Sequence, residues 1–365
     1  MKVALVHDYI KEYGGAEGVL ETLHEIWPKA PIYTTVYLPS YLGPHKKRFK
    51  KWDIRSSFLQ GMPFKGKLIS PIRLLAPFVF KNMDFSNYDV VIVSATGAYN
   101  PNLIRKGKAI HFCYCHTPPR YLYGYPTARN WKEKIVFRVL GEIANHFLRM
   151  VDYKSAQNVD SFIANSKEVK ARINKFYRKK AEIIYPPVDI PKKLKRAKKG
   201  KYYLAGGRLA RAKRVDLAIK AATKLGLPLK VFGKEFAGYG EELRKMAGQN
   251  VEFLGEVTDK KKWELMAGAK AFIFPAEFED FGITPVEAMA AGTPVIALHS
   301  GGVVESVIEG RTGVFFDEPT ADSLTKAIRK FEKSKIKPED CVKQARKFSK
   351  ERFKKEIKEF VEKHA

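Results

Sequence analysis

The sequence predicts two α/β domains, each a parallel, doubly wound sheet with helices on both faces. Three observations support this prediction. The 365 residues exceed the length at which a single hydrophobic core usually keeps growing. Short apolar strands alternate with helical patterns along the chain, which is typical of a parallel sheet. The alternation breaks once and restarts, so we expect a first domain at 1–187 and a second at 188–342.

The first domain opens on the apolar strand Lys2–His7, which is followed by a glycine pair and an amphipathic helical pattern from Ala16. Cys113 and Cys115 lie two apart in a predicted strand, so they share a face and are interpreted as small core residues. Three sparse cysteines do not make a disulfide framework. The other expected strands are Tyr88–Ser94, Ala109–Cys115 and Ser161–Asn165, and the expected helices include Trp131–Tyr153 and Lys167–Phe176.

The break between the domains is Tyr185–Asp189, which contains two prolines, followed by the basic run Pro191–Lys201. This composition is typical of an interdomain linker, and contact of the basic run with a phosphate-bearing ligand is the alternative. The strands expected after it are Lys201–Ala205, Leu229–Phe232, Val251–Leu254, Ala271–Phe274 and Pro294–Leu298. The helices expected between them are Val215–Leu225, Glu241–Met246, Lys260–Gly268 and Pro285–Ala291.

The tail at 343–365 has the pattern of an amphipathic helix with a bend near Ser349. One broad face must be buried, and we expect this C-terminal helix to return to the first domain. The face contains Ala345, Phe353, Ile357, Phe360 and Val361, with Phe348 at its edge.

The chain is strongly basic, with 67 Lys and Arg against 39 Asp and Glu and a formal charge of +28. Such a charge attracts nucleic acid, anionic membranes or phosphorylated ligands. A lysine-rich composition is the alternative, with solvated helix positions such as Lys260, Lys261 and Lys262. No helix-turn-helix, zinc-finger, RRM or KH signature is present, which argues against a nucleic-acid-binding protein.

Neither a secretory signal nor an apolar run of the ~18 residues needed for a membrane span is found. We therefore expect a cytoplasmic protein, with peripheral attachment to the inner face of the cell membrane as a further expectation. The basic and aromatic segment Leu68–Met83 either docks on an anionic membrane surface or covers the core of the first domain.

The segment Glu277–Gly292 (EFEDFGITPVEAMAAG) follows the expected strand Ala271–Phe274. Open α/β sheets bind ligands at the carboxyl ends of their strands. Gly282 permits a close backbone approach, and the N–H groups of a helix beginning near Pro285 suit a diphosphate. Glu287 has a structural alternative, because Thr284 as N-cap and Glu287 three residues later would make a capping box.

Within this segment, Glu279 and Glu287 are eight residues apart and resemble the E-x7-E signature of the family 4 glycosyltransferases. These enzymes have the GT-B fold, in which two Rossmann-like domains face each other across a cleft. The resemblance implies that Glu279 contacts the hydroxyls of the donor sugar and Glu287 the ribose of the nucleotide. Four residues between them also become candidates for donor binding: Phe281, Gly282, Ile283 and Thr284.

Two further segments of the second domain carry the resemblance. Gly206–Arg208 with Lys213 and Arg214 resembles the family's G-R-L…K signature, which implies that Arg208 and Lys213 hold the donor diphosphate. A departing phosphate needs fixed cations; the alternative is that Lys213 and Arg214 are solvated at a helix start. Leu254 and Val257 resemble the segment that cups the nucleotide base.

In the first domain, Gly14 and Gly15 resemble the glycine loop that closes over the donor phosphate and the acceptor. His116 stands in the run CYCHTPPRYLY, which resembles a subset that includes bacterial O-antigen mannosyltransferases. This implies that His116 lies beside the transferred hexose and that Arg120 and Tyr121 line the acceptor side.

The resemblance implies a retaining, metal-independent hexosyltransferase of polysaccharide biosynthesis, with His116, Arg208, Lys213 and Glu279 as catalytic residues. No Asp-x-Asp pair is present to hold a divalent metal, and no cofactor is expected. Mannose from GDP-mannose is the expected donor, with UDP-sugars as alternatives, and a lipid-linked glycan or polysaccharide is the expected acceptor. A soluble sucrose- or trehalose-type synthase is the other enzyme reading.

Overall fold

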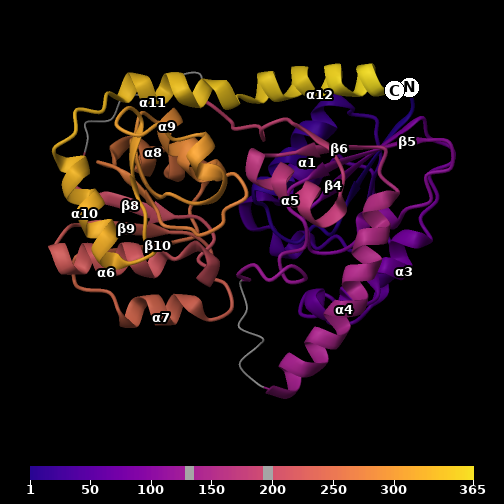
Figure 1. The fold of residues 1–365 in the computed structure, drawn as a ribbon, viewed down its shortest axis with the longest axis horizontal. Coiled ribbons are helices and arrows are strands. Elements are labelled where there is room, and N and C mark those ends of the chain that lie inside the picture. The colour runs from indigo at the N-terminus through magenta and orange to yellow at the C-terminus, as the bar shows by residue number, and fades with distance from the viewer. Residues whose placement is uncertain (128–134, 192–199) are drawn as a thin grey trace. The chain divides into compact units, whose positions relative to one another are not determined.

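The computed structural model describes residues 1–127, 135–191 and 200–365, and these residues form two compact units (Figure 1). The first unit contains 1–125, 135–187 and 351–365, and the second contains 126–127, 188–191 and 200–350. The chain therefore leaves the first unit after Pro187 and re-enters it at Glu351.

The first unit is built on a parallel sheet. Its described strands are β1 (Val3–His7), β2 (Ile32–Thr34), β3 (Ile54–Ser56), β4 (Val90–Ala95), β5 (Ile110–Cys115), β6 (Ser161–Ala164) and β7 (Ala181–Ile183). Their order is β3-β2-β1-β4-β5-β6-β7, so the strand order reverses between β1 and β4, where open α/β sheets bind ligands. Every residue of β1 and β4 is buried, as expected for strands covered on both faces. The helices are α1 (Gly15–Ile26), α2 (Ile69–Ile72), α3 (Ala76–Lys81), α4 (Ile135–Gln157), α5 (Lys167–Tyr177) and α12 (Lys350–His364), with 3-10 turns η1 (Pro39–Tyr41), η2 (Gly43–Phe49), η3 (Phe58–Gly61) and η4 (Pro101–Leu103).

The second unit repeats this architecture. Its described strands are β8 (Tyr203–Gly206), β9 (Leu229–Phe232), β10 (Val251–Gly255), β11 (Phe272–Phe274), β12 (Val295–Leu298) and β13 (Gly313–Phe316). All pair in parallel in the order β10-β9-β8-β11-β12-β13, so the order reverses between β8 and β11. The helices are α6 (Val215–Leu225), α7 (Tyr239–Lys245), α8 (Asp259–Gly268), α9 (Ile283–Ala290), α10 (Ala321–Glu332) and α11 (Pro338–Ala345), with 3-10 turns η5 (Arg211–Lys213), η6 (Gly301–Glu305) and η7 (Arg346–Phe348).

The doubly wound α/β fold predicted for both domains is confirmed. Each predicted strand is present, with ends that differ by one or two residues, as is usual at element termini. Four strands of three or four residues (β2, β3, β7 and β13) and helix α10 were not predicted. Of the predicted helix Trp131–Tyr153, 131–134 lies outside the described residues, and α4 continues to Gln157. Most of the basic run Pro191–Lys201, namely 192–199, also lies outside them.

The C-terminal helix returns to the first unit, as predicted. Phe353, Ile357 and Phe360 of α12 enter a core shared with β5, where the rings of Phe360 and Phe112 lie 5.4 Å apart. The preceding residues differ from the prediction, because 343–350 belongs to the second unit. Ser349 is extended and separates η7 from α12, so Phe348 packs on Phe281 with ring centroids 5.3 Å apart.

The segment Leu68–Met83 covers the core of the first unit. It forms α2 and α3, whose inner residues include the buried Ile72 and Phe80. The outer residues Leu74 and Phe78 are exposed. Cys113 and Cys115 are buried in the same core, as predicted. Across the residues that the structure describes, no helix is long and apolar enough to cross a membrane.

Candidate active site

Two glycines cross closely after β8 and β9, next to the point where the strand order of the second unit reverses. Gly207 follows β8 with a φ of +117°, and Gly233 follows β9 with a φ of +135°. A Cβ at Gly233 would stand 1.6 Å from the carbonyl oxygen of Gly207, whereas a Cβ at Gly207 would lie 3.8 Å from Thr284 Oγ1. The loop after β8, which carries Arg208, and the first turn of α9 are therefore neighbours at this sheet edge.

The loop after β11 brings two predicted site residues together. Lys213 at the end of η5 places its Nζ 2.5 Å from Glu279 Oε2, and both side chains are largely buried. The backbone of Glu279 is held by two glycines of η6. Gly302 N–H donates to its carbonyl oxygen at 2.7 Å, and a Cβ at Gly301 would lie 2.4 Å from that same oxygen. Glu279, which the resemblance implies contacts the sugar, and Lys213, which it implies holds the diphosphate, thus form one ion pair on a fixed backbone.

Glu287 is paired with Lys262 of α8. The structure around Glu287 corrects two interpretations of the sequence. The N-cap of α9 is Gly282, with a left-handed φ of +87°, so the helix begins at Ile283 and Thr284 is not its N-cap. Lys262 is also not solvated, because its Nζ lies 2.7 Å from Glu287 Oε1 and the side chain is 21% exposed. Burial opposes the charge of Lys262, but attraction to Glu287 prevails and raises its pKa.

The remaining cations of the predicted site are also engaged. The guanidinium of Arg208 lies 5.7 Å from the ring of Phe236. Arg214 Nη1 donates to Glu277 Oε1 at 2.9 Å, so Arg214 is not the solvated cation of the alternative interpretation. Leu254 lies in β10, one residue before the end of the strand, and Val257 lies two residues after it. Both side chains are half-buried.

In the first unit, His116 is tied to the strand-order reversal by hydrogen bonds. Its Nε2 lies 2.9 Å from Ser94 Oγ on β4, and that oxygen lies 3.1 Å from His7 Nδ1 at the end of β1. Burial lowers the pKa of His116 to about 3, and the neighbouring His7 acts in the same direction. The imidazole of His116 is therefore neutral near pH 7, with one nitrogen donating and the other accepting.

The same chain of groups reaches the predicted glycine loop. His7 Nε2 lies 3.7 Å from Glu17 Oε1, and Glu17 Oε2 accepts a hydrogen bond from Gly14 N–H at 2.9 Å. Gly15 is the first residue of α1. Sequence reasoning did not connect His7 and Ser94 with the candidate site, and it placed Glu17 there only as the last residue of the glycine-loop motif. The available signal was that His7 and Ser94 are polar residues near the carboxyl ends of apolar strands.

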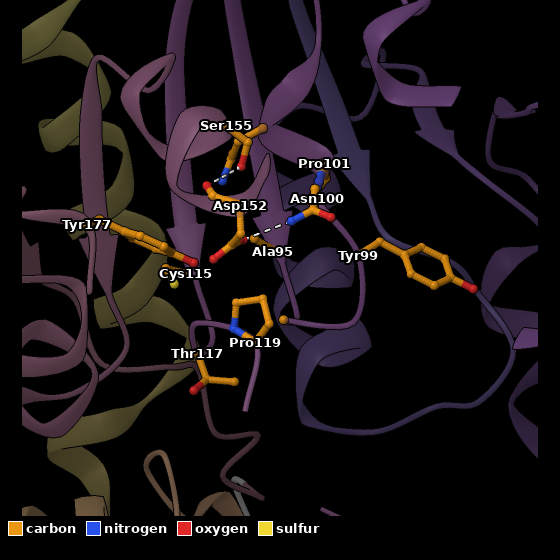
Figure 2. A pocket seen from close by; sticks show the side chains of 12 residues that line it. Ala95, Tyr99, Asn100, Pro101, Cys115, Thr117, Pro119, Asp152, Ser155 and Tyr177 are labelled. Carbon is orange, nitrogen blue, oxygen red and sulfur yellow. Dashed lines mark hydrogen bonds between the residues drawn. The ribbon is translucent and has the colours of Figure 1, made fainter. Parts of the chain in front are cut away.

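The turn after His116 rests on a buried polar cluster (Figure 2). Asp152 of α4 accepts hydrogen bonds from Asn100 Nδ2 at 2.9 Å and from the Tyr123 hydroxyl at 2.8 Å. Burial raises the pKa of Asp152 to about 7, against these hydrogen bonds. From α5, the buried Arg172 donates to Thr117 Oγ1 at 3.1 Å. Asp152 and Asn100 thus line one small pocket with Thr117 and Pro119 of the turn that follows His116.

Two family models together match most of the chain. The model described as Glycosyltransferase Family 4 matches residues 13–192, and the model described as Glycosyl transferases group 1 matches residues 188–348. The chain belongs to glycosyltransferase family 4.

Mannosyltransferases are among its relatives in this family. Human alpha-1,3/1,6-mannosyltransferase ALG2 is 30% identical over 281 residues, which cover 67% of this chain and 64% of ALG2. The chain thus spans less than two thirds of the length of this relative. The lipopolysaccharide core biosynthesis mannosyltransferase LpcC of Rhizobium leguminosarum is 33% identical over 136 residues, covering 33% of this chain and 38% of LpcC.

Solved structures of other glycosyltransferases share the two-unit fold. Anabaena HepE in complex with UDP and glucose matches with a TM-score of 0.72 and 19% identity, covering 99% of both chains. Sucrose-phosphate synthase from Thermosynechococcus elongatus matches with a TM-score of 0.73 and 16% identity, covering 100% of this chain and 99% of the synthase. At these identities the likeness shows the GT-B fold.

Proposed function

We propose that this family 4 chain is a retaining glycosyltransferase that moves mannose from GDP-mannose to a lipid-linked glycan or polysaccharide. The observation that carries the proposal is the pairing of Lys213 with Glu279 beside the glycine crossing of the second unit. The mannosyltransferase relatives favour mannose over other hexoses.

The donor site of the proposal lies at the carboxyl ends of β8 and β11. Lys213 and Arg208 face the diphosphate, and Glu279 accepts hydrogen bonds from the sugar hydroxyls. The N–H groups of α9 add partial positive charge for the phosphates, and Glu287 receives the ribose hydroxyls. The base lies against Leu254 and Val257, and the loop Phe281–Thr284 supplies the backbone approach.

The chemistry of the proposal is attack of an acceptor hydroxyl on the anomeric carbon from the face that the diphosphate leaves. The bond to the β-phosphate oxygen breaks, and that oxygen takes the proton of the acceptor hydroxyl. Lys213 and Arg208 stabilise the developing phosphate charge. Neutral His116 contacts the transferred hexose beside the loop of Gly14 and Gly15, with Arg120 and Tyr121 on the acceptor side.

No cofactor enters this proposal, and the phosphate charge is balanced by protein cations. Within the described part of the chain, no cluster of His, Cys, Asp and Glu is arranged to hold a metal ion. The acceptor is proposed to lie at the inner face of the cell membrane, with the chain attached to it peripherally. A UDP-glucose donor, as in the complexes of HepE, and a soluble acceptor, as in a sucrose-phosphate synthase, are the competing substrates.

The test is a thermal-shift screen of the purified chain with GDP-mannose, GDP, UDP-sugars and UDP, in the presence of a metal chelator. A ligand that binds the folded state raises the unfolding midpoint. We expect a shift with the GDP series, abolished in Lys213→Met and Glu287→Gln. Lys326→Met, at an exposed position of α10, is the matched control and keeps the shift.

Product analysis completes this test. With GDP-mannose and a polyprenyl diphosphate-linked glycan, the proposal expects an α-linked mannoside. A shift confined to the UDP series would mean that a UDP-sugar is the donor. The screen is repeated without the chelator, and shifts that appear only in its absence would refute metal independence. A folded chain that binds none of these nucleotides would overturn the proposed function.

A further inference from the structure

Helix α4 buries several polar residues on its inward side, together with Leu148 and Ala156, and exposes a row of apolar residues on its outward side. Its inward side includes the buried Asn145, Asp152 and Ser155, which belong to the polar cluster under the His116 turn or border it. A surface helix of a globular protein normally shows the opposite arrangement, with the apolar stripe toward the core. The outward face is more than half exposed at each of Val139, Ile143, Phe147 and Met150, which recur at the spacing of one helix face.

A second apolar surface lies on the outer side of α2, α3 and the segment before them. Leu74 and Phe78 are exposed there, and the rings of Phe58 and Phe78 lie 6.4 Å apart. Helices α3 and α4 both pack against η4, and Figure 1 shows α3 next to the C-terminal half of α4. The two apolar surfaces therefore belong to neighbouring elements of one unit.

Tyr121 connects the two surfaces. The guanidinium of Arg73, at the end of α2, lies 3.6 Å from the centroid of the Tyr121 ring. The carbonyl oxygen of Tyr121 accepts a hydrogen bond from Asn145 of α4 at 3.4 Å. The residue implied to line the acceptor side thus sits between the two exposed apolar surfaces.

The charges around these surfaces are positive. The stretch 64–83 contains Lys65, Lys67, Arg73 and Lys81 and no Asp or Glu. On α4, Arg138 and Lys154 are exposed, Asp152 is buried and Glu142 is half-buried, so the exposed charges of the two surfaces are predominantly positive. A two-fold contact with a second copy would bring like charges together, whereas an anionic bilayer attracts cations and accepts apolar side chains at its interface.

We propose that the outward face of α4, together with the exposed residues of α2 and α3, docks the first unit on an anionic bilayer. The apolar side chains enter the interface, and the lysine and arginine side chains bind the headgroups. The inference deepens the proposed function and rests on it for its purpose, since it delivers a lipid-linked acceptor to the side of Tyr121.

The test is sedimentation of the full chain with vesicles of phosphatidylcholine alone and of phosphatidylcholine mixed with phosphatidylglycerol. We expect binding to the mixed vesicles that weakens as salt is raised. Ile143→Glu with Phe147→Glu lowers the bound-to-free ratio at least about tenfold, and Leu74→Glu with Phe78→Glu acts in the same direction. Ile308→Glu, at an exposed apolar position of the second unit, is the matched control and binds as the unmodified chain does.

Each outcome bears on the docking surface separately from the donor. Equal vesicle binding by the α4 variant and the unmodified chain overturns the proposal, as does absence of binding to the mixed vesicles. Self-association that the α4 variant abolishes, without vesicle binding, would instead assign the face to a second copy. The thermal shift with GDP-mannose is measured on the same variants and should persist, which shows that they are folded. If the chain bound vesicles but no nucleotide sugar, the proposed function would be wrong and the proposed docking surface would stand.

Discussion

At the scale of single residues, one hydroxyl connects the two histidines of the first unit. Ser94 Oγ lies within hydrogen-bond distance of both His116 Nε2 and His7 Nδ1. Which nitrogen of a neutral imidazole carries the proton is set by such partners. In the proposed function, Ser94 is therefore a positioning residue, which acts on the sugar only through the nitrogen that His116 would present to it.

Replacing Ser94 by Ala should lower turnover with little effect on donor affinity. The change leaves two buried ring nitrogens without their partner, and a buried unpaired polar group costs about 1–3 kcal/mol. We expect kcat to fall about tenfold to a hundredfold, the range that this cost represents when it appears in the transition state. The donor Kd, measured by titration calorimetry, should change less than about twofold, a change worth under ~0.5 kcal/mol.

The conservative variant Ser94→Thr supplies the control, because it keeps the hydroxyl. It should recover most of the lost turnover, whereas a packing role for Ser94 would leave Thr, the larger side chain, as damaging as Ala. Equal losses in kcat for the Ala and Thr variants would contradict the positioning role.

The sequence identifies candidate site residues that stand in a recognisable motif. It misses those whose place in the candidate site depends only on tertiary contacts. Glu279, Glu287 and Lys213 stand in recognisable segments, and the structure brings Lys213 onto Glu279. The partners Lys262 and Ser94 lie on other elements, and nothing in their local sequence indicates which atoms they meet. The capping box at Thr284 failed for a related reason, since the left-handed backbone at Gly282 starts the helix before it.

At the scale of elements, the two loops after β8 and β9 cross with no space between them. Gly233 is the crossing point, because a Cβ there would overlap the carbonyl oxygen of Gly207. Its φ of +135° is also a conformation that L-residues rarely adopt. The position of the loop after β8, which carries Arg208, therefore depends on Gly233 in the loop after β9.

Gly233→Ala should destabilise the second unit by about 3 kcal/mol or more, because the backbone of one loop must move. Gly226→Ala is the matched control, since Gly226 ends α6 with a φ of +64° and a Cβ there would meet no atom within 4 Å. It should cost about 1 kcal/mol through backbone strain alone. Urea unfolding followed by hydrogen exchange of the β8 and β11 amides measures both variants, and similar losses for the two would refute the crossing argument.

Among the strands of the first sheet, prediction succeeded where the apolar run was long and failed where it was short; in the second unit the twelve-residue helix α10 was also not predicted. β4 and β5 are six-residue buried strands, and their apolar runs identify them without tertiary information. β2 and β3 have three residues each, too few for a period, and they form because β1 offers an edge to extend. Helix α4 was predicted as a helix, but its pattern alone does not say which side faces inward.

At the scale of the whole molecule, the first unit is completed by the last residues of the chain. α12 contributes Phe353, Ile357 and Phe360 to the core around β1 and β5, although the chain has by then passed through the second unit. That core is therefore incomplete until the whole chain is present. The two units have separate cores, so their unfolding should be followed with probes specific to each.

The buried ionisable groups of the first unit give its stability opposing dependences on pH. His111 and His116 have pKa values lowered to about 3 by burial, so the unfolded chain binds more protons than the folded one below the ordinary value of 6.5. Their contribution to stability is lost as pH falls through that window. Asp152 acts in reverse, since its pKa is raised from 3.8 to about 7. The folded state holds a proton that the unfolded chain releases, so stability is lost as pH rises from about 4 to 7.

Asp152→Asn isolates one of these contributions, because the histidines remain in both proteins and cancel in the difference. The neutral amide has no proton to lose, so the variant should gain stability relative to the unmodified chain as pH rises. The expected gain is about 1.4 kcal/mol per pH unit between pH 4 and 7. It is measured by hydrogen exchange of the β4 and β5 amides in urea at pH 4.5, 5.5 and 6.5. Parallel stability curves for the two proteins would mean that Asp152 ionises alike in both states, and that the cluster beneath the His116 turn holds a charged carboxylate throughout.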